Sequence, residues 1–393
     1  MRRRILSLAL ASAAALAVGG ASGSVASARP GGSAGWRLSF LRTCGNGGAL
    51  SSVTATGLGD AWAVGEPDSA GPSCVAEVVH WNGRRWRHIP VSARLAGVQA
   101  FPLLLTASSA TNAWIFPETE QFPGGCRCSY FFAARWNGRK WRTSRFPAKI
   151  FVVSAATFSP ADTWAFGWTS PLLGPELPYA ARYDGRAWHR VRLPGAVLAV
   201  SALSRRDMWA IGPTLKTATR QVARQAIVAM HWNGRSWHAI TAPRIATRTR
   251  EYDSDLYGTF AAAAGPHELW WGYQANAKRS SLGLLRWDGT QWHQIKLPKP
   301  ITGIIDMAQD GRGGIWLITS TDDKPQDGCA PAYWYHYNRR WTRQLVPCYP
   351  KGYSVNRLYG LGWIPRTTGV WAAGQAYIGN TFQTVSVIAR YHT

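Results

Sequence analysis

The residues best suited to catalysis lie in one short segment, Glu251-Tyr252-Asp253-Ser254-Asp255, which offers carboxylates and a tyrosine. A glycan-cleaving site with paired carboxylates needs a second acid about 5 to 9 Å away, supplied by another part of the fold. Asp306 is the candidate for that partner. Acidic loop residues more often cap turns, and the chain has no Gly-x-Ser-x-Gly elbow or phosphate-binding glycine loop. We therefore assign no catalytic residue, and a glycan hydrolase or lyase remains an alternative.

Histidine could supply a metal site or a general base, and the chain has nine. Seven of them recur at equivalent places in a repeated unit, where other copies have Arg or Thr: His80, His88, His189, His231, His238, His293 and His336. The other two, His267 and His392, have no ligand spacing to another histidine. The sequence therefore predicts no metal site and no cofactor.

Positive charge is the strongest chemical bias, with 44 Lys and Arg against 20 Asp and Glu and a formal net charge of +24. Such a surface attracts polyanions, including teichoic acid, acidic polysaccharide, nucleic acid and an anionic membrane face, although charge also serves solubility. Eight cations fall in three neighbouring loops, with three aromatic residues expected at the same end, and this mixture suits acidic sugars or phosphate polymers. The predicted ligand-binding set is Lys216, Arg220, Arg224, Arg244, Arg248, Arg250, Lys278, Arg279, Trp168, Trp271 and Tyr273.

The elements that position these residues belong to a sequence repeat, which is recognised by its regularly spaced tryptophans. Seven of the 22 Trp close a short apolar run at a mean spacing of about 51 residues: Trp62, Trp114, Trp164, Trp209, Trp270, Trp316 and Trp371. A second unit alternates with the first, and its first copy is Trp81-Asn82-Gly83-Arg84-Arg85-Trp86. Asn-Gly between aromatic flanks predicts a type I′ hairpin turn. We expect the arginines of these turns to ring one face and stack on indoles, namely Arg84, Arg139, Arg186, Arg235 and Arg339.

Each period contains two hairpin-like halves, hence four strands, which is the size of a propeller blade. We therefore predict an all-β, seven-bladed β-propeller with four-stranded antiparallel blades. The last repeat ends at Tyr391 without a fourth strand, whereas Trp36-Arg37-Leu38-Ser39-Phe40 resembles one. This N-terminal strand is predicted to join the C-terminal blade and close the ring. The recurring tryptophans would then fill the wedges between blades.

The Asp-x-Trp-Ala-x-Gly and Trp-Asn-Gly-Arg-x-Trp units resemble the tryptophan-rich, Kelch-like propeller repeats of secreted bacterial proteins, over nearly all of residues 36–393. The segment Asp310-Gly311-Arg312-Gly313-Gly314-Ile315-Trp316 also looks like the blade motif of sensor propellers and streptogramin lyases, but it occurs once. The resemblance implies the fold. Propellers of this kind include ligand binders, hydrolases, lyases and copper oxidases, so it implies no single function.

Residues 1–28 have the pattern of a signal peptide. A basic start, an apolar run from Ile5 to about Val18, and the small-x-small signal Ala26-Ser27-Ala28 succeed one another. The apolar run is too short to span a bilayer, and no later stretch reaches about 20 apolar residues. We expect cleavage near Ala28, secretion, a short flexible segment at 29–35, and a single monomeric propeller at 36–393.

The six cysteines of an exported chain are expected to be oxidised. All six are predicted on the face opposite the Asn-Gly turns. The simplest pairing joins adjacent loops as Cys44–Cys74 and Cys329–Cys348. Cys126 and Cys128 would then either pair with each other in a strained small ring or stay reduced.

Three functions are open at this point. The charge favours a non-catalytic binding scaffold that recognises an anionic polysaccharide or cell-wall polymer through the basic loops. The second function is the glycan hydrolase or lyase with a central-pocket site. The third is a scaffold for another extracellular protein.

Overall fold

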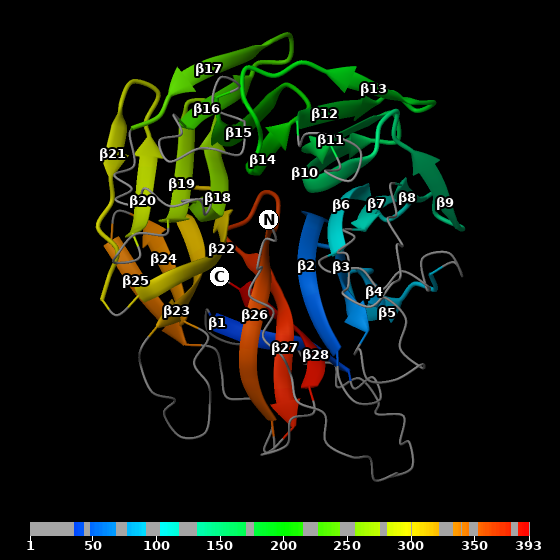
Figure 1. The fold of residues 1–393 in the computed structure, drawn as a ribbon. Coiled ribbons are helices and arrows are strands. Elements are labelled where there is room, and N and C mark those ends of the chain that lie inside the picture. Colours follow the sequence, from blue (N-terminus) through cyan, green and yellow to red (C-terminus); the bar gives the residue numbers. More distant parts are fainter. Residues whose placement is uncertain are drawn as a thin grey trace, which may run out of the picture.

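The structure, a computed structural model, describes residues 35–42, 48–67, 77–91, 103–117, 132–169, 177–214, 227–243, 256–275, 281–299, 301–321, 333–338, 340–345, 353–378 and 384–392. Within these ranges every regular element is a β-strand, and the strands form seven four-stranded antiparallel sheets. Figure 1 shows the sheets arranged as blades around a central axis. The predicted seven-bladed propeller is confirmed.

Six blades follow the chain in order, each running from its inner strand to its outer strand. Blade 1 has β2 (Gly48–Gly57), β3 (Asp60–Pro67), β4 (Glu77–Trp81) and β5 (Trp86–His88). Blade 2 has β6 (Leu103–Ser109), β7 (Asn112–Pro117), β8 (Phe132–Trp136) and β9 (Trp141–Arg145). Blade 3 has β10 (Ile150–Ser159), β11 (Asp162–Thr169), β12 (Pro178–Tyr183) and β13 (Trp188–Val191).

The next three blades repeat this order. Blade 4 has β14 (Ala199–Ser204), β15 (Asp207–Pro213), β16 (Ile227–Trp232) and β17 (Trp237–Thr241). Blade 5 has β18 (Leu256–Gly265), β19 (Glu268–Ala275), β20 (Ser281–Trp287) and β21 (Trp292–Gln294). Blade 6 has β22 (Ile301–Gln309), β23 (Ile315–Thr321), β24 (Tyr333–Asn338) and β25 (Arg340–Leu345).

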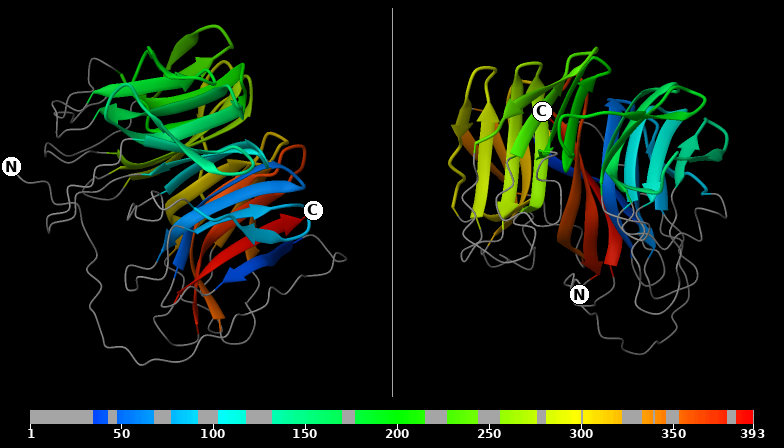
Figure 2. Two further views of the ribbon diagram at one scale, coloured as in Figure 1. Left: turned by 90° about the vertical axis from the view of Figure 1, so that its right-hand side faces the viewer. Right: turned by 45° about the horizontal axis from the view of Figure 1, so that its top comes forward.

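Blade 7 is built from both ends of the described chain. Its strands β26 (Tyr353–Trp363), β27 (Val370–Ile378) and β28 (Thr384–His392) come last in sequence, and β1 (Gly35–Arg42) pairs antiparallel with β28. Trp36 lies opposite Tyr391, as predicted. The inner strand β26 also contacts β2 of blade 1, so the ring is closed. Figures 1 and 2 show the blue β1 beside the red β28.

Tryptophan fills the space between blades. The seven Trp of the second strands are at most 1% exposed. Trp114 lies edge-on to two rings of the next blade, 4.9 Å from Tyr183 and 5.4 Å from Trp188. Trp371 packs in the same way at 5.1 Å from Trp86, across the seam between blades 7 and 1. Edge-to-face aromatic pairs at these distances stabilise beyond the area that they bury, which confirms the predicted wedge role.

The Asn-Gly turns differ in detail from the prediction. A type I′ turn needs positive φ at both central residues, but Gly83 has φ of +89° while Arg366 alone among the described non-glycine residues has positive φ. The Asn82 N–H donates to the carbonyl of Arg85 at 3.3 Å, so Gly83 and Arg84 are the central residues, and the glycine is the first of them, as in a type II′ turn. Asn82 precedes it, and its Oδ1 accepts hydrogen bonds from the backbone N–H groups of Arg84 and Arg85. Asn82 therefore caps the turn with its side-chain amide, and its backbone does not adopt the left-handed conformation.

These turns share a face with the turns that follow the inner strands. The indole Nε1 of Trp81 donates to the carbonyl of Leu58, 3.2 Å away in the first turn of the same blade. The strands of a meander alternate in direction, so the predicted division into two faces is supported for the described turns. No helix within the described ranges is long and apolar enough to cross a membrane.

Candidate ligand-binding surface

Most of the sequence-predicted site lies outside the described residues. This holds for the eight loop cations Lys216, Arg220, Arg224, Arg244, Arg248, Arg250, Lys278 and Arg279. It also holds for the segment from Glu251 to Asp255 and for all six cysteines, so the disulfide pairing and the basic loop cluster stay predictions.

The three predicted aromatic residues occupy different environments. Trp168 is partly exposed near the end of β11. Tyr273 is partly buried on β19, and burial raises its pKa. Trp271 is fully buried, with its ring 6.1 Å from that of Trp292. The prediction for Trp271 is corrected, because an indole packed inside the fold offers no face to a surface ligand.

A polar stack, which the sequence analysis did not anticipate, recurs in six blades. Each consists of a second-strand indole, a third-strand His or Arg lying over or beside that ring, and an acceptor that hydrogen-bonds the His or Arg. The rings of Trp62 and His80 are 4.4 Å apart, and His80 Nε2 lies 2.6 Å from the Asp60 carboxylate. The acceptor–base pairs are Asp60–His80, Asn112–Arg135, Asp162–Arg182, Asp207–His231, Glu268–Arg286 and Asp310–His336.

Strand register explains the stack. Trp62 lies opposite His80 on the neighbouring strand, and Trp164 lies opposite Arg182 in the same way. Arg182 sits 5.1 Å from the Trp164 ring centre and makes two hydrogen bonds to Asp162. Cation–π attraction and a bidentate carboxylate therefore hold one guanidinium. Within the described residues the Arg–Trp contacts are made by third-strand arginines, so the predicted stacking of the turn arginines is wrong for Arg84, Arg139, Arg186 and Arg235.

The stacks and turns occupy the acidic side chains. Burial acts to raise the pKa of Asp310, but hydrogen bonds from His336 and from the backbone of Arg312 and Gly314 lower it overall. In the turns, Asp184 accepts hydrogen bonds from the backbone N–H groups of Ala187 and Arg186 and lies 2.8 Å from His189, and these contacts lower its pKa. Asp288 is held similarly by Gln291, His293 and Thr290, with a lowered pKa. These described carboxylates are thus held by hydrogen bonds from the protein itself.

The outer wall, which we define as the seven strands β1, β5, β9, β13, β17, β21 and β25, contains no Asp or Glu. Its side chains include the exposed cations Arg87, Arg142, Arg145 and Arg190. None of these four makes an ion pair within the described part of the chain. The outer wall is therefore a surface of one charge sign.

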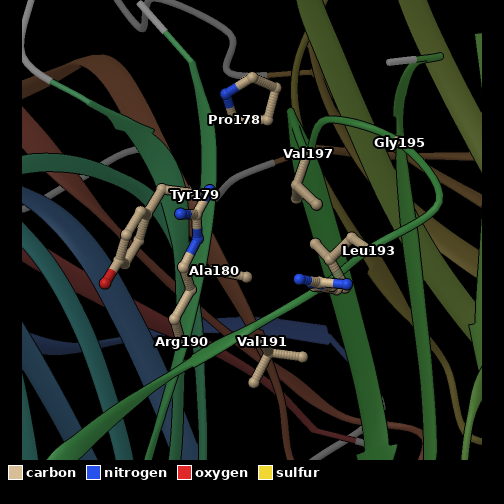
Figure 3. Close-up of a pocket in the computed structure, with 9 residues that line it drawn as sticks. Pro178, Tyr179, Ala180, Arg190, Val191, Leu193, Gly195 and Val197 are labelled. Atoms are coloured by element: carbon tan, nitrogen blue, oxygen red, sulfur yellow. The ribbon is translucent and has the colours of Figure 1, made fainter.

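A recess opens beside this wall between blades 3 and 4. It has a volume of about 180 Å³ and is lined by Pro178, Tyr179, Ala180, Arg190, Val191, Arg192, Leu193, Gly195 and Val197 (Figure 3). Arg190 lies 5.3 Å from the ring centre of Tyr179, and both Arg190 and Arg192 are exposed. Burial raises the pKa of Tyr179, and Arg190 acts to lower it. The recess is smaller than the roughly 300 Å³ at which sites for whole small ligands begin, so it suits one acidic group or one sugar unit.

Asp306 is the one acidic residue on the seven inner strands of the described structure. Burial of its carboxyl group raises its pKa to about 7, against hydrogen bonds from the backbone of Leu361 and Met307. The Leu361 N–H donates across the boundary between blades 6 and 7 at 2.6 Å, and the Met307 N–H donates at 2.8 Å. Both oxygens are thus held by backbone. The part of the chain that the structure describes brings no second carboxylate beside them and no metal-binding cluster of His, Cys, Asp or Glu.

The comparisons with known proteins identify the fold and nothing finer. No protein-family model matches the chain, and no curated protein sequence matches it. Among solved structures, "YCF48 bound to D1 peptide" has a TM-score of 0.50 at 12% identity, covering 91% of this chain and 95% of that one. A polysaccharide lyase, the PL25 ulvan lyase bound to a GlcA–Rha3S unit, has a TM-score of 0.50 at 10% identity, with coverage of 88% and 95%.

A glycoside hydrolase shares the same fold. The GH74 xyloglucanase from Xanthomonas campestris has a TM-score of 0.51 at 15% identity over 87% of this chain, which spans about half (53%) of that protein. Identities this low support the propeller fold alone. The functions of these proteins differ, so binding and enzymatic roles both remain possible for this chain.

Both halves of the polar stack were visible in the sequence. An acidic residue or Asn stands two positions before the second-strand Trp in five repeats, and His precedes the third-strand aromatic in three. Pairing of the two strands brings these positions together. The signal that joins them is the antiparallel register between the second and third strands, which places Trp62 opposite His80.

Proposed function

We propose that this protein is a secreted binding propeller that holds an anionic polysaccharide or cell-wall polymer against its outer wall. The observation that carries the proposal is the charge distribution: the outer wall has exposed arginines and no acid, while five of the described acids are committed to internal stacks. The exposed arginines lie on the neighbouring outer strands of blades 1 to 3, and such a run of positive charge matches a polymer with repeated negative groups. Export rests on the signal-peptide pattern of residues 1–28.

The recess between blades 3 and 4 supports a carbohydrate ligand. Arginine beside an aromatic ring provides both charge and a flat apolar face, and Val191, Leu193 and Val197 add apolar lining. A sugar ring with a carboxylate or sulfate uses both kinds of contact. The basic loops from Lys216 to Arg224 and from Arg244 to Arg250 are proposed to extend this surface.

The test uses dextran sulfate as the anionic probe and neutral dextran of equal chain length as the uncharged control. We expect the mature chain to bind dextran sulfate with an affinity that falls steeply with salt, because bound polyanions release counterions. The outer-wall variant R142E/R145E/R190E is expected to bind at least about tenfold more weakly, as expected when several charge contacts reverse.

A matched variant, R84E/R139E/R235E, changes the same number of charges on the exposed turns. It should keep most of the affinity. Equal losses in both variants would show attraction by net charge alone, and an unchanged affinity in the outer-wall variant would refute the proposal. The variant R244E/R248E/R250E tests the contribution of the basic loops in the same assay.

The second candidate is a glycan hydrolase or lyase, and the residue to test for it is Asp306, the one acid on the described inner strands. The assay measures reducing ends and unsaturated products released from sulfated and uronic-acid polysaccharides. Turnover that is lost in D306N would favour the enzyme. If neither binding nor turnover is found, the scaffold for an extracellular protein is the function that remains.

A further inference from the structure

Blade 7 keeps the ring-and-cation part of the polar stack but lacks the acceptor. Arg390 lies 5.0 Å from the ring centre of Trp371, and strand pairing places the two residues opposite each other, as in the other blades. Two positions before Trp371, where four blades carry an acid and one carries Asn, the chain has Gly369.

Blade 6 shows where else an acceptor can come from. Its longer turn brings Asp310 to His336, and the Asp310 N–H donates to the carbonyl of Gly314 at 3.0 Å. The turn of blade 7 has the equivalent bond, from the N–H of Ile364 to the carbonyl of Gly369 at 3.0 Å. Ile364 thus occupies the position of Asp310, and it is fully buried. Neither route supplies a carboxylate to Arg390.

One hydrogen-bond donor of the Arg390 guanidinium lacks an acceptor. Its Nε is buried and has no hydrogen-bond acceptor, whereas the Nε atoms of Arg135, Arg182 and Arg286 all donate to stack acceptors. Burial lowers the pKa of Arg390, and no carboxylate acts against that effect. A buried donor without an acceptor is unusual in a native fold, and an anion beside this cation would balance its charge.

We propose that blade 7 binds a carboxylate or sulfate group at the exposed part of the Arg390 guanidinium, which the described chain does not pair with an Asp, Glu or Asn of its own. The side chain is partly exposed, so part of the guanidinium is open to solvent. Its planar fork pairs with such oxyanions through two hydrogen bonds. The inference rests on the proposed function for the source of the group, which is the acidic substituent of the bound polymer.

The position also connects the anion to ring closure. Arg390 is on β28, directly opposite Arg37 of β1. An anion bound at Arg390 therefore lies at the strand pair that closes the ring.

The experiment measures the melting temperature in sodium sulfate and in sodium chloride of equal ionic strength. We expect a sulfate-specific rise for the mature chain, because a ligand that binds only the folded state stabilises it. R390Q should lose at least half of that rise. R182Q in blade 3 is the matched control, since Arg182 already has Asp162 as its partner, and it should keep the rise. A full rise in R390Q overturns the proposal.

Two further variants keep the test decisive if R390Q folds poorly. R390K retains a charge without the planar fork and should show a reduced rise. I364D places a carboxylate at the position of Asp310, so it should pair with Arg390 and abolish the sulfate-specific rise. A full rise in I364D, in a variant that remains folded, contradicts the site.

A binding assay with dextran sulfate distinguishes two sources of the group at Arg390, a polymer and a free anion. If the polymer supplies the group, R390Q also weakens dextran sulfate binding, by about threefold or more. A lost sulfate rise with unchanged polymer affinity overturns the polymer as the occupant. Failure of the outer-wall variant R142E/R145E/R190E to weaken binding refutes the proposed function alone, because the sulfate rise at Arg390 does not depend on that wall.

Discussion

The inner and outer halves of each blade belong to the same repeat, but their side chains differ strongly in charge and burial. The described inner strands are composed mostly of small and apolar residues, with Asp306 as their one acid, and the second strands bury seven indoles. The outer strands have no acid and expose arginine. The difference teaches that the buried aromatic packing lies nearer the axis, whereas the proposed binding surface lies at the rim. Substitutions in the two halves should therefore have separable effects.

The largest expected effect is on stability, from the inner half. Trp164→Ala removes a buried indole that packs 5.2 Å from Trp232 of the next blade. Truncation of a buried Trp costs about 3–5 kcal/mol, from lost burial and the cavity left behind. Denaturant unfolding of the mature chain measures this loss. A loss below about 1 kcal/mol would mean that the wedges do not dominate stability.

Asp306 gives the inner half a pH dependence. The folded chain keeps the carboxyl protonated up to a pKa of about 7, whereas the unfolded chain ionises it near 3.8. Between these values the folded state binds more protons, so the free energy of unfolding falls as pH rises from about 4 to about 7. The loss attributable to this group is on the order of 2–4 kcal/mol. Unfolding of the wild type and D306N across this range should show a pH slope that is smaller in D306N, and equal slopes would contradict the assignment.

The polar stack lies at the border between the two halves. Asp162→Ala leaves Arg182 and the indole N–H of Trp164 without their acceptor. We expect the free energy of unfolding to fall by about 1–2 kcal/mol, because Arg182 is partly exposed and can hydrogen-bond to water in place of Asp162. D162N reproduces the Asn112 arrangement of blade 2 and should lose less. If D162N is the more damaging variant, charge matters more in the stack than the presence of an acceptor.

The smallest stability effect is expected at the rim. Arg142→Glu and Arg145→Glu change exposed side chains that make no ion pair within the described structure. Their individual effects on the free energy of unfolding should stay within about 0.5 kcal/mol. Dextran sulfate affinity measured on the same samples should fall. Stability losses as large as those of Trp164→Ala would erase the distinction between the two halves.

The fold could be predicted from the sequence because each repeat contains its own strand and turn signals, in residues that are close together in the chain. Trp62 and Gly83 recur with their neighbours in nearly every blade, and the pairing of Trp36 with Tyr391 followed from one incomplete repeat. Side-chain roles were harder, because they depend on which face of a strand is covered. Trp271 follows Trp270 directly, and both faces of β19 turned out to be buried. The predicted loop cations carry no repeat signal, and the described structure leaves them untested.

The union of β1 with β28 has a consequence for biogenesis. Some 340 residues separate the two strands, so blade 7 cannot be completed until the chain has been made through β28. A chain that lost its final strand would leave β1 with no neighbour to pair with and expose the edge of β27 to other chains. We therefore expect a chain that stops before β28 to form an open, aggregation-prone arc of blades instead of a closed ring.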